Sequence, residues 1–591
     1  MRLAGFEPFP IEQQKRVAVQ KAVNQLSKEG GQGPSPKVFF LTNYTLNGIE
    51  VFLSYHLLQK KLRPQIEFSD FNVVVQTVLD SDSSLYASAP DFLVLSLDLR
   101  ILVKDFYLNA WDARQVAGEL GELLALIRDK IGAPVLVTDF VLPLADNAAR
   151  AGSLDSKVLL LNRTLAEFAA GHARQFFLLD SNRLVGLLGV RESLDAKLWH
   201  QSKAPFKSPF LSWLAREMAT IIGAHYGLSK KCLILDCDNT LWGGVVGEDG
   251  MAGIALDANA YPGVAFHEFQ AHLLNLHAQG VLLTICSKNN EADVLQVLRE
   301  HPHCLLKPEH FVCIRANWNS KAENIADIAA TLQLGLNNFV FIDDSPVECA
   351  LVEQALPGLD IIQAPADPLA LRHIRHAEDL FFVPYRSAED GQKQQQYKDN
   401  GSRRDSAAGF ADVAQFLRSL ETSVELYRDE PAQLERLAQL TQKTNQFNLR
   451  TARYSPPDVA RFIDSPAHVV LSMRVQDKFG DLGITNLCII ELDGSGGAFV
   501  DTFLMSCRVI KRDLEFFFFH HCLQVLRERY GVLRIGAAFI PTGKNMLVER
   551  LWDDVGLQLL ATDRDGVKHY AAPLDQLGYA RPEHIHIKGV H

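Results

Sequence analysis

The chain lacks the features that would place it in a membrane or in a secreted compartment. No apolar run in its 591 residues reaches the roughly 18 residues that a membrane-spanning helix needs. The first ten residues include an acid and two prolines where a secretory signal would be apolar. These absences predict a cytoplasmic protein with no membrane partner.

Paired cysteines and an excess of positive charge are also missing. The 9 cysteines all lie from Cys232 onward without zinc-like spacing, so neither a disulfide framework nor a structural zinc site is expected. The formal net charge of -11 argues against nonspecific binding of nucleic acid. We therefore expect reduced thiols and no nucleic-acid partner, while a local basic patch would still suffice to bind an acidic protein.

The chemistry is concentrated in the stretch Leu233–Gly250. The apolar run Cys232–Leu235 is typical of a buried parallel strand. It ends in two acids one residue apart, Asp236 and Asp238, which together suit a divalent cation. They also suit phosphoryl transfer, with Asp236 as the nucleophile and Asp238 as the acid/base. Taken alone, this spacing is equally typical of a solvated acidic turn.

Polar side chains of matching kinds follow the next predicted strands. Ser287 ends the apolar run Val281–Cys286, and its hydroxyl can bind a phosphoryl oxygen. Lys321 opens a helical stretch, where its ammonium can neutralise phosphate and nucleophile together. Asp343 and Asp344 follow a third strand and add carboxylates for the metal. This order of groups indicates a metal-assisted phosphoryl-transfer site.

The order of these groups resembles the haloacid dehalogenase (HAD) superfamily of magnesium-dependent phosphotransferases. Asp238–Gly250 is similar to the FkbH-type branch of that superfamily, as are Ile285–Asn290, Asn317–Lys321 and Ile342–Pro346. The resemblance implies Mg²⁺ as the cofactor, held among the four acids named above.

The same resemblance implies contacts with the substrate from residues in the matching stretches. Thr240 and Asn289 are expected to contact the phosphate ester. Trp242 lies in a flap, Trp242–Gly250, where it could pack over a substrate or anchor its own hairpin.

No cap domain fits into this part of the chain. Between Asp236 and Ser287 there is room for the flap, a loop and a helix around Phe266–Gln279, and between Ser287 and Lys321 for about one helix and one strand. We therefore expect an open site. A site without a lid favours a phosphate presented by another macromolecule, such as a carrier protein.

Five apolar segments precede the phosphatase stretch and alternate with amphipathic ones, which predicts a three-layer α/β domain with a parallel sheet. The segments are Val38–Leu41, Ile66–Phe68, Phe92–Leu97, Val135–Thr138 and Phe176–Leu179. Their pattern resembles the SGNH-hydrolase-like domain of FkbH-type proteins. No serine follows the first strand, and Asp195 and His200 stand at the wrong interval for an active hydrolase, so the domain is expected to be non-catalytic. Asp80, Asp98 and Asp180 are expected to be caps.

The last part of the chain resembles the acetyltransferase-like (GNAT) module that ends FkbH-type proteins. The likeness is carried by Thr444–Leu449, Asp477–Gly483 and Met505–Val509. GNAT domains cradle a coenzyme A pyrophosphate on a glycine-bearing loop, but Arg508–Asp513 contains no glycine. The sequence therefore does not predict coenzyme A binding by that loop. Arg508 could attract a phosphate or a phosphopantetheine arm, or belong to a solvated basic turn.

The predicted fold class is α/β, with an SGNH-like three-layer domain, a capless HAD Rossmann-like domain and a GNAT-like α+β domain. The predicted boundaries are 1–36 for a lead-in, 37–228 for the SGNH-like domain, 229–381 for the phosphatase domain, 382–418 for a polar connector and 419–591 for the GNAT-like domain.

The family resemblance also implies a function. FkbH-type proteins are implicated in taking a phosphoglyceryl unit from 1,3-bisphosphoglycerate and placing it on a phosphopantetheinylated acyl carrier protein as a thioester. They are further implicated in removing the remaining phosphate, in polyketide or related secondary-metabolite biosynthesis. The alternatives are a magnesium-dependent phosphatase of a small molecule or protein without acyl-transfer activity, and a nonenzymatic scaffold.

An enzyme thiol for the acyl step would have to be partly exposed and near positive charge. Cys507 and Cys286 are the candidates, because the first precedes an arginine and the second precedes Ser287. Cys237 ranks last, since strand alternation points it away from the side chain of Asp236. Each of these cysteines could instead be a small buried apolar residue.

Overall fold

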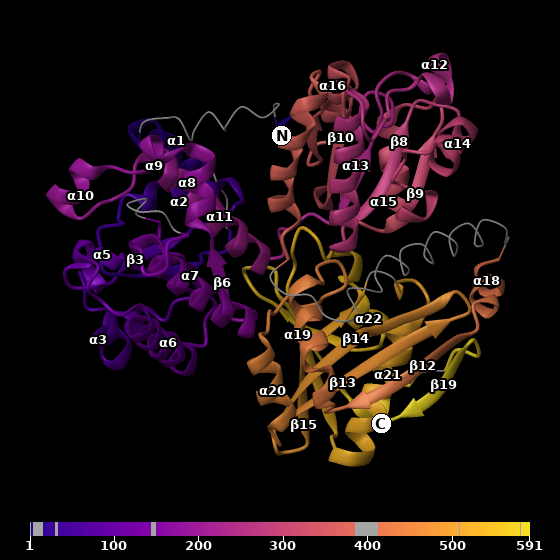
Figure 1. Cartoon of the computed structure of the whole chain (residues 1–591). Helices are drawn as coiled ribbons and strands as arrows, with labels where there is room; N and C mark the ends of the chain where they lie inside the picture. Colours follow the sequence, from indigo (N-terminus) through magenta and orange to yellow (C-terminus); the bar gives the residue numbers. More distant parts are fainter. Residues whose placement is uncertain are drawn as a thin grey trace. The chain divides into compact units, whose positions relative to one another are not determined.

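The computed structural model describes residues 2–3, 16–29, 33–142, 149–383, 412–506, 509–578 and 581–591 (Figure 1). The chain divides into two compact units. One unit comprises Ala4–Lys230 with His373–Tyr385, and the other comprises Met1–Leu3, Lys231–Arg372 and Arg386–His591. The predicted connector falls mostly on residues 384–411, which lie outside the described residues.

The first unit contains a parallel sheet with the strand order β3-β2-β4-β5-β6. Its strands are β2 (Lys37–Thr42), β3 (Gln65–Phe68), β4 (Phe92–Ser96), β5 (Val135–Thr138) and β6 (Phe176–Leu179). All five predicted strands are therefore confirmed, with ends that differ by one residue at most. Side chains alternate along β2, so that Val38 and Phe40 pack in one apolar cluster while Phe39 and Leu41 pack in another. Both faces of the sheet are thus covered, as the three-layer prediction requires.

Helices precede, connect and follow these strands. They are α1 (Arg16–Glu29), α2 (Ile49–Gln59), α3 (Val74–Leu79), α4 (Ser84–Ser88), α5 (Leu99–Leu102), α6 (Ala113–Lys130), α7 (Leu154–Gly171), α8 (Ser181–Leu188), α9 (Val190–Ser193), α10 (Ala196–Ser202) and α11 (Ser208–His225). Asp98, Asp180 and Asp195 cap α5, α8 and α10, since each carboxylate accepts a hydrogen bond from a backbone N–H in the first turn. Asp80 accepts a turn hydrogen bond from the N–H of Asp82 at 3.0 Å. These acids are therefore structural.

The middle of the chain forms a second parallel sheet, with the order β1-β11-β10-β7-β8-β9. Its strands are β1 (Arg2–Leu3), β7 (Cys232–Leu235), β8 (Leu282–Ser287), β9 (Phe311–Ala316), β10 (Phe339–Asp343) and β11 (Asp360–Gln363). The chain runs outward from β7 through β8 to β9 and then crosses back to β10. The order reverses between β7 and β10, where α/β sheets open a crevice at their carboxyl ends.

The helices of this domain are α12 (Val246–Gly253), α13 (Gly263–Ala278), α14 (Glu291–Glu300), α15 (Lys321–Leu332) and α16 (Pro346–Ala355). Residues 236–321 are all described, and they contain α12 to α14, β8, β9 and a short 3₁₀ turn. No separate cap domain is present in that range, as the spacing predicted.

The last part of the chain forms a mostly antiparallel sheet with the order β17-β18-β16-β15-β14-β13-β12-β19. Its strands are β12 (Thr422–Arg428), β13 (His468–Asp477), β14 (Gly480–Leu492), β15 (Gly497–Met505), β16 (Arg534–Phe539), β17 (Gln558–Thr562), β18 (Lys568–Pro573) and β19 (Ile585–Val590). Its helices are α18 (Val413–Ser419), α19 (Leu434–Lys443), α20 (Pro456–Asp464), α21 (Leu514–Tyr530) and α22 (Leu551–Asp554). The pairs β15–β16 and β12–β19 are parallel. The architecture is α+β, and its core gathers between the sheet and α21.

Candidate active site

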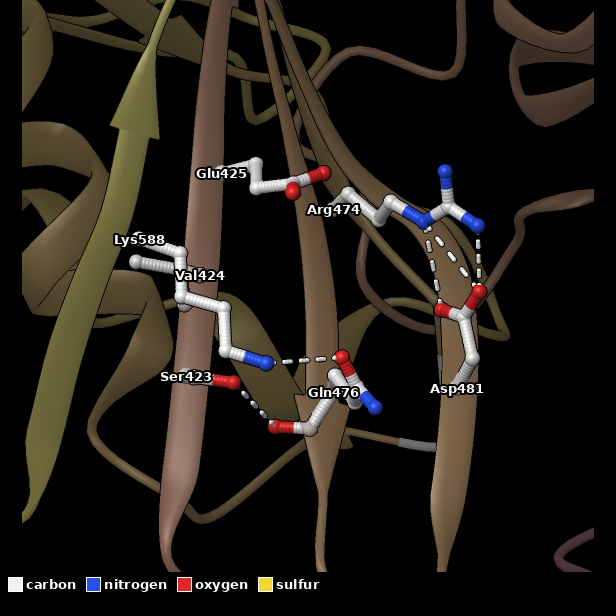
Figure 2. Close-up of a pocket in the computed structure, with 7 residues that line it drawn as sticks. All are labelled: Ser423, Val424, Glu425, Arg474, Gln476, Asp481 and Lys588. Atoms are coloured by element: carbon white, nitrogen blue, oxygen red, sulfur yellow. Dashed lines mark hydrogen bonds and ion pairs between the residues drawn. The ribbon is translucent and has the colours of Figure 1, made fainter.

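A pocket of about 250 Å³ lies on the sheet of the C-terminal domain (Figure 2). It is lined by Ser423, Val424, Glu425, Arg474, Gln476, Asp481 and Lys588. Lys588 Nζ donates to Gln476 Oε1 at 2.9 Å, and Arg474 pairs with Asp481. Its polar groups are largely engaged with one another, and none of the predicted site residues lines it. The chemistry lies elsewhere.

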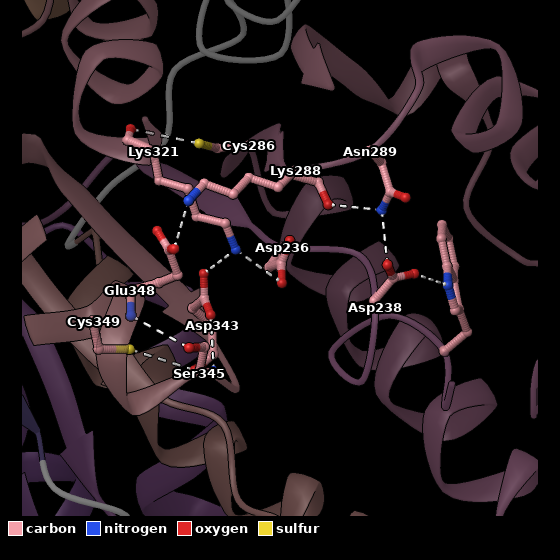
Figure 3. Close-up of polar contacts among 12 residues, drawn as sticks. Asp236, Asp238, Cys286, Lys288, Asn289, Lys321, Asp343, Ser345, Glu348 and Cys349 are labelled. Atoms are coloured by element: carbon pink, nitrogen blue, oxygen red, sulfur yellow. Dashed lines mark hydrogen bonds and ion pairs between the residues drawn. The ribbon is translucent and has the colours of Figure 1, made fainter. Parts of the chain in front are cut away.

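The predicted acids meet at the carboxyl edge of the middle sheet. Asp236 follows β7, and Asp343 ends the neighbouring strand β10. The register places Leu235 opposite Ile342, and the N–H of Asp236 donates to Ile342 O at 3.0 Å. The two carboxylates therefore lie side by side at the point where the strand order reverses (Figure 3). Ser287 ends β8, on the other side of β7, and is 1% exposed.

Lys321 links these acids. It is the first residue of α15, whose N-terminus is capped by Ser320. Its Nζ lies 2.5 Å from Asp343 Oδ2 and 3.0 Å from Asp236 Oδ2 (Figure 3). Burial by itself would lower the pKa of Lys321, but the two carboxylates outweigh burial and raise that pKa above its usual range. The ammonium is therefore charged at neutral pH and faces the predicted nucleophile.

The residues fit a divalent cation. Carboxylate oxygens of Asp236, Asp343 and Asp344 all lie within 4.8 Å of one another. Asp236 Oδ1 is buried and has no hydrogen-bond partner among the described residues. Burial, reinforced by the nearby Asp343, raises the pKa of Asp236 to about 6 despite the opposing effect of Lys321.

Burial also raises the pKa values of Asp343 and Asp344. The charges of this group do not balance, because three carboxylates face one ammonium. A divalent cation with a preference for oxygen ligands would compensate both remaining negative charges and would bind Asp236 Oδ1. Mg²⁺ matches this donor set, and Asp236, Asp343 and Asp344 are the residues that would hold it.

Asp238 has a different environment from the one predicted. Its Oδ1 accepts hydrogen bonds from Trp242 Nε1 at 2.9 Å and from the N–H of Val246 at 3.1 Å. Its Oδ2 accepts from Asn289 Nδ2 at 2.9 Å (Figure 3). The prediction that the Asp238 side chain is a metal ligand is thereby corrected, because three donors hold this carboxylate outside the group of the other acids. The same three bonds fix its orientation, as an acid/base would need.

Trp242 does not lie over a substrate. Its side chain is fully buried and donates to Asp238, so the substrate-binding prediction is corrected in favour of the alternative that Trp242 anchors its own loop. Asn289 is buried and also donates to Ser287 Oγ at 3.1 Å. Thr240 is fully buried, and its hydroxyl has no hydrogen-bond partner among the described residues. Substrate contacts from Thr240 and Asn289 remain predictions.

The three candidate cysteines differ in whether the structure describes them. Cys286 is fully buried and its thiol donates to the backbone carbonyl of Lys321. Burial raises the pKa of the Cys286 thiol to about 12, so this residue is wrong as a thiolate nucleophile. Cys237 is buried as well, with a pKa raised well above its usual value by burial. Cys507 and Arg508 lie outside the described residues.

Two contacts around the site were not predicted. Lys288 Nζ lies 2.7 Å from Glu348 Oε1, which joins the end of β8 to the first turn of α16. The N–H of Ser345 donates to Asp343 Oδ1 at 2.9 Å, and the Ser345 hydroxyl caps α16. Lys288 lies within Ile285–Asn290, a stretch that resembles the FkbH-type branch, so the sequence could have indicated that it lies near the site. Glu348 offered none, because an acid in the first turn of a helix is ordinary.

Comparison with known proteins concerns the same part of the chain as this site. Residues 231–362 match the family model of the NLI interacting factor-like (NIF) phosphatases. The crystal structure of the N-terminal part of a Bacteroides fragilis protein, containing a phosphatase domain complexed with Mg, has 24% sequence identity and a TM-score of 0.58, over 63% of this chain and 100% of that chain. This likeness establishes the fold. A search of curated proteins found no significant match.

Structures of acetyltransferases also align with part of the chain. A GNAT-family acetyltransferase from Streptococcus pneumoniae covers 25% of this chain and 99% of that chain, with 12% sequence identity and a TM-score of 0.20. A TM-score this low carries no argument, so the GNAT-like architecture remains a prediction, as does the SGNH-like one.

Residues 231–362 are therefore similar to the NIF-like phosphatases, in agreement with the fold of the Bacteroides fragilis phosphatase domain. The coarser part of the predicted identity is confirmed, and the FkbH-type branch remains a prediction. Among the helices of the described residues, none combines the length and the apolar character needed to cross a bilayer.

Proposed function

We propose that this protein is a magnesium-dependent phosphatase in which Asp236 is the nucleophile. The observation that carries the proposal is the buried group of Asp236, Lys321 and Asp343, in which one oxygen of the nucleophile is paired with an ammonium and the other is unpaired. Burying charged groups without full compensation is unfavourable for folding, and such groups are typical of functional sites.

The proposed reaction has two displacements. A carboxylate oxygen of Asp236 forms a bond to phosphorus while the ester oxygen leaves and takes a proton from Asp238. Water then attacks the aspartyl phosphate, Asp238 accepts its proton, and inorganic phosphate departs with the carboxylate restored. Lys321 stabilises the charge on the transferring phosphoryl group. Bound Mg²⁺ would supply further charge neutralisation at the phosphoryl oxygens.

We further propose that the phosphate ester is a phosphoglyceryl unit, loaded from 1,3-bisphosphoglycerate onto an acyl carrier protein. The capless arrangement supports a substrate presented by a macromolecule, because no inserted domain in residues 236–321 encloses the site. The family resemblance supports the identity of the unit. With Cys286 excluded, the acyl acceptor would be Cys507 or the pantetheine thiol of the carrier itself.

A phosphatase without acyl-transfer activity is the second candidate. One observation favours it: all eight cysteines in the described part of the chain are buried, so none of them offers an accessible thiolate.

The two candidates differ in what happens to a carrier protein. The purified protein is incubated with a phosphopantetheinylated carrier and 1,3-bisphosphoglycerate, and the intact mass of the carrier is then measured. A mass increase equal to a glyceryl or phosphoglyceryl thioester supports acyl transfer. Hydrolysis of phosphate esters with no change in carrier mass supports the second candidate.

A further inference from the structure

The loop between β9 and α15 carries an exposed tryptophan close to the phosphoryl site. Trp318 is 71% exposed and stands three residues before Lys321. A chain of three residues spans at most about 11 Å, so the backbone of Trp318 lies within that distance of the backbone of Lys321. The loop that carries Trp318 is therefore a near neighbour of the phosphoryl site along the chain.

This loop is tied down by hydrogen bonds rather than left loose. The N–H of Asn317 donates to Ser287 O at 3.1 Å. The side chains of Asn317 and Asn324 donate to each other at 3.2 and 2.9 Å. Trp318 Nε1 donates to Asn290 Oδ1 at 3.1 Å. The indole is thus connected to Asn290, the residue after Asn289, which contacts both Asp238 and Ser287.

The indole ring of Trp318 is exposed although its N–H group is already hydrogen-bonded. A single exposed apolar side chain is ordinary on a protein surface and needs no explanation. Trp318 differs from that case because its only polar atom is already bonded while most of its ring remains open to solvent. Trp242, in the same domain, satisfies its Nε1 in the same way but is fully buried. Another exposed apolar side chain, that of Val347, lies in the first turn of α16, directly after β10.

We propose that Trp318 contacts the substrate, packing its ring against an apolar part of the alcohol group beyond the phosphoryl group. The contact has to be apolar, because the indole N–H is engaged by Asn290 and the ring has no other polar atom. The proposal rests on the phosphatase function proposed above. In a phosphoglyceryl unit held on a carrier, the thioester and the pantetheine chain extend beyond the glyceryl group and would supply the apolar surface.

The test compares two esters that differ in apolar surface, 1-naphthyl phosphate and glycerol 3-phosphate. Trp318→Ala should lower kcat/KM for 1-naphthyl phosphate by roughly five- to tenfold and should change the value for glycerol 3-phosphate by less than about twofold. Trp318→Phe keeps an aromatic face and should retain much of the selectivity. Tyr107→Ala, which removes a comparably exposed aromatic ring (65%) from the other unit, should leave both values unchanged.

Equal losses on both esters would mean that Trp318 only supports the structure of the loop and would overturn the proposal, as would no loss on either. If the wild-type protein hydrolyses neither ester, the phosphatase function is judged on a phosphoglyceryl carrier and the Trp318 contact is judged by binding. Calorimetric titration of 1-naphthyl phosphate into the wild-type protein in Mg²⁺ buffer then decides the inference separately. The Kd should be roughly fivefold weaker when Trp318→Ala is added, and an unchanged Kd, or the absence of binding, would refute the contact.

Discussion

Replacing Lys321 by alanine removes the ammonium that lies 3.0 Å from Asp236 and 2.5 Å from Asp343. At an effective dielectric constant of about 20, each contact corresponds to an attraction on the order of 5 kcal/mol. The cost of burying the ammonium, several kcal/mol, offsets much of this attraction. The variant should still lose a few kcal/mol of transition-state stabilisation, because no ammonium then neutralises the negative charge on the transferring phosphoryl group.

We therefore expect Lys321→Ala to lower kcat by about 10²-fold or more in steady-state phosphatase assays at saturating Mg²⁺. Lys321→Met, which keeps most of the side-chain length without the charge, should give the same loss, so that charge is separated from packing. Lys288→Ala is the matched control, because it removes a nearby ammonium that pairs with Glu348 instead. An effect of Lys321→Ala confined to KM would show that the lysine only binds the ester and would refute the reasoning.

Three further predictions concern the nucleophile, the metal and the first unit. Asp236→Asn should abolish phosphatase turnover with an unchanged circular dichroism spectrum, yet it should still load phosphoglycerate onto a carrier. Cys507→Ala should hydrolyse a supplied phosphoglyceryl carrier but fail to load one. Intact-mass spectra of the carrier distinguish the two species, and normal turnover by Asp236→Asn would contradict its assignment as the nucleophile. Excess chelator should stop turnover, and undiminished turnover in chelator would exclude the metal. Mg²⁺ should raise the unfolding temperature of the wild-type protein, because only the folded state binds the ion. It should not raise that of Asp343→Asn, which lacks one of the carboxylates of the site. Burial raises the pKa of Glu217 from 4.5 to about 7 although Arg183 opposes the shift, so the folded state retains a proton that the unfolded state releases. The free energy of unfolding should therefore fall as pH rises from about 4.5 to 7, by at most about 3 kcal/mol. Urea unfolding should show a smaller fall in Glu217→Gln, and identical pH profiles for the two proteins would disprove the role of Glu217.

Most strands, and the grouping of the main candidate residues, could be predicted because parallel sheets obey a simple rule. Buried strands on both faces read as apolar runs, and the residues that follow them meet at one edge of the sheet. Asp236, Ser287 and Asp343 each stand at the end of such a run, and Lys321 begins the helix after another. No strand was predicted at β1, β11, β17 or β18. In β17 all five residues are exposed, and its short apolar run Leu559–Ala561 lacks the alternation that marks a half-buried strand.

The amino-acid sequence by itself determined which side chains gather at the edge of the middle sheet, because that depends only on where apolar runs end. Tertiary structure alone decided what each side chain contacts. Three donors hold Asp238 away from the other acids, and Trp242 is buried. Lys288 pairs with Glu348 across 60 positions of the chain. The physical reason is that side-chain direction alternates regularly only within a strand, whereas past its end direction depends on partners that distant segments supply.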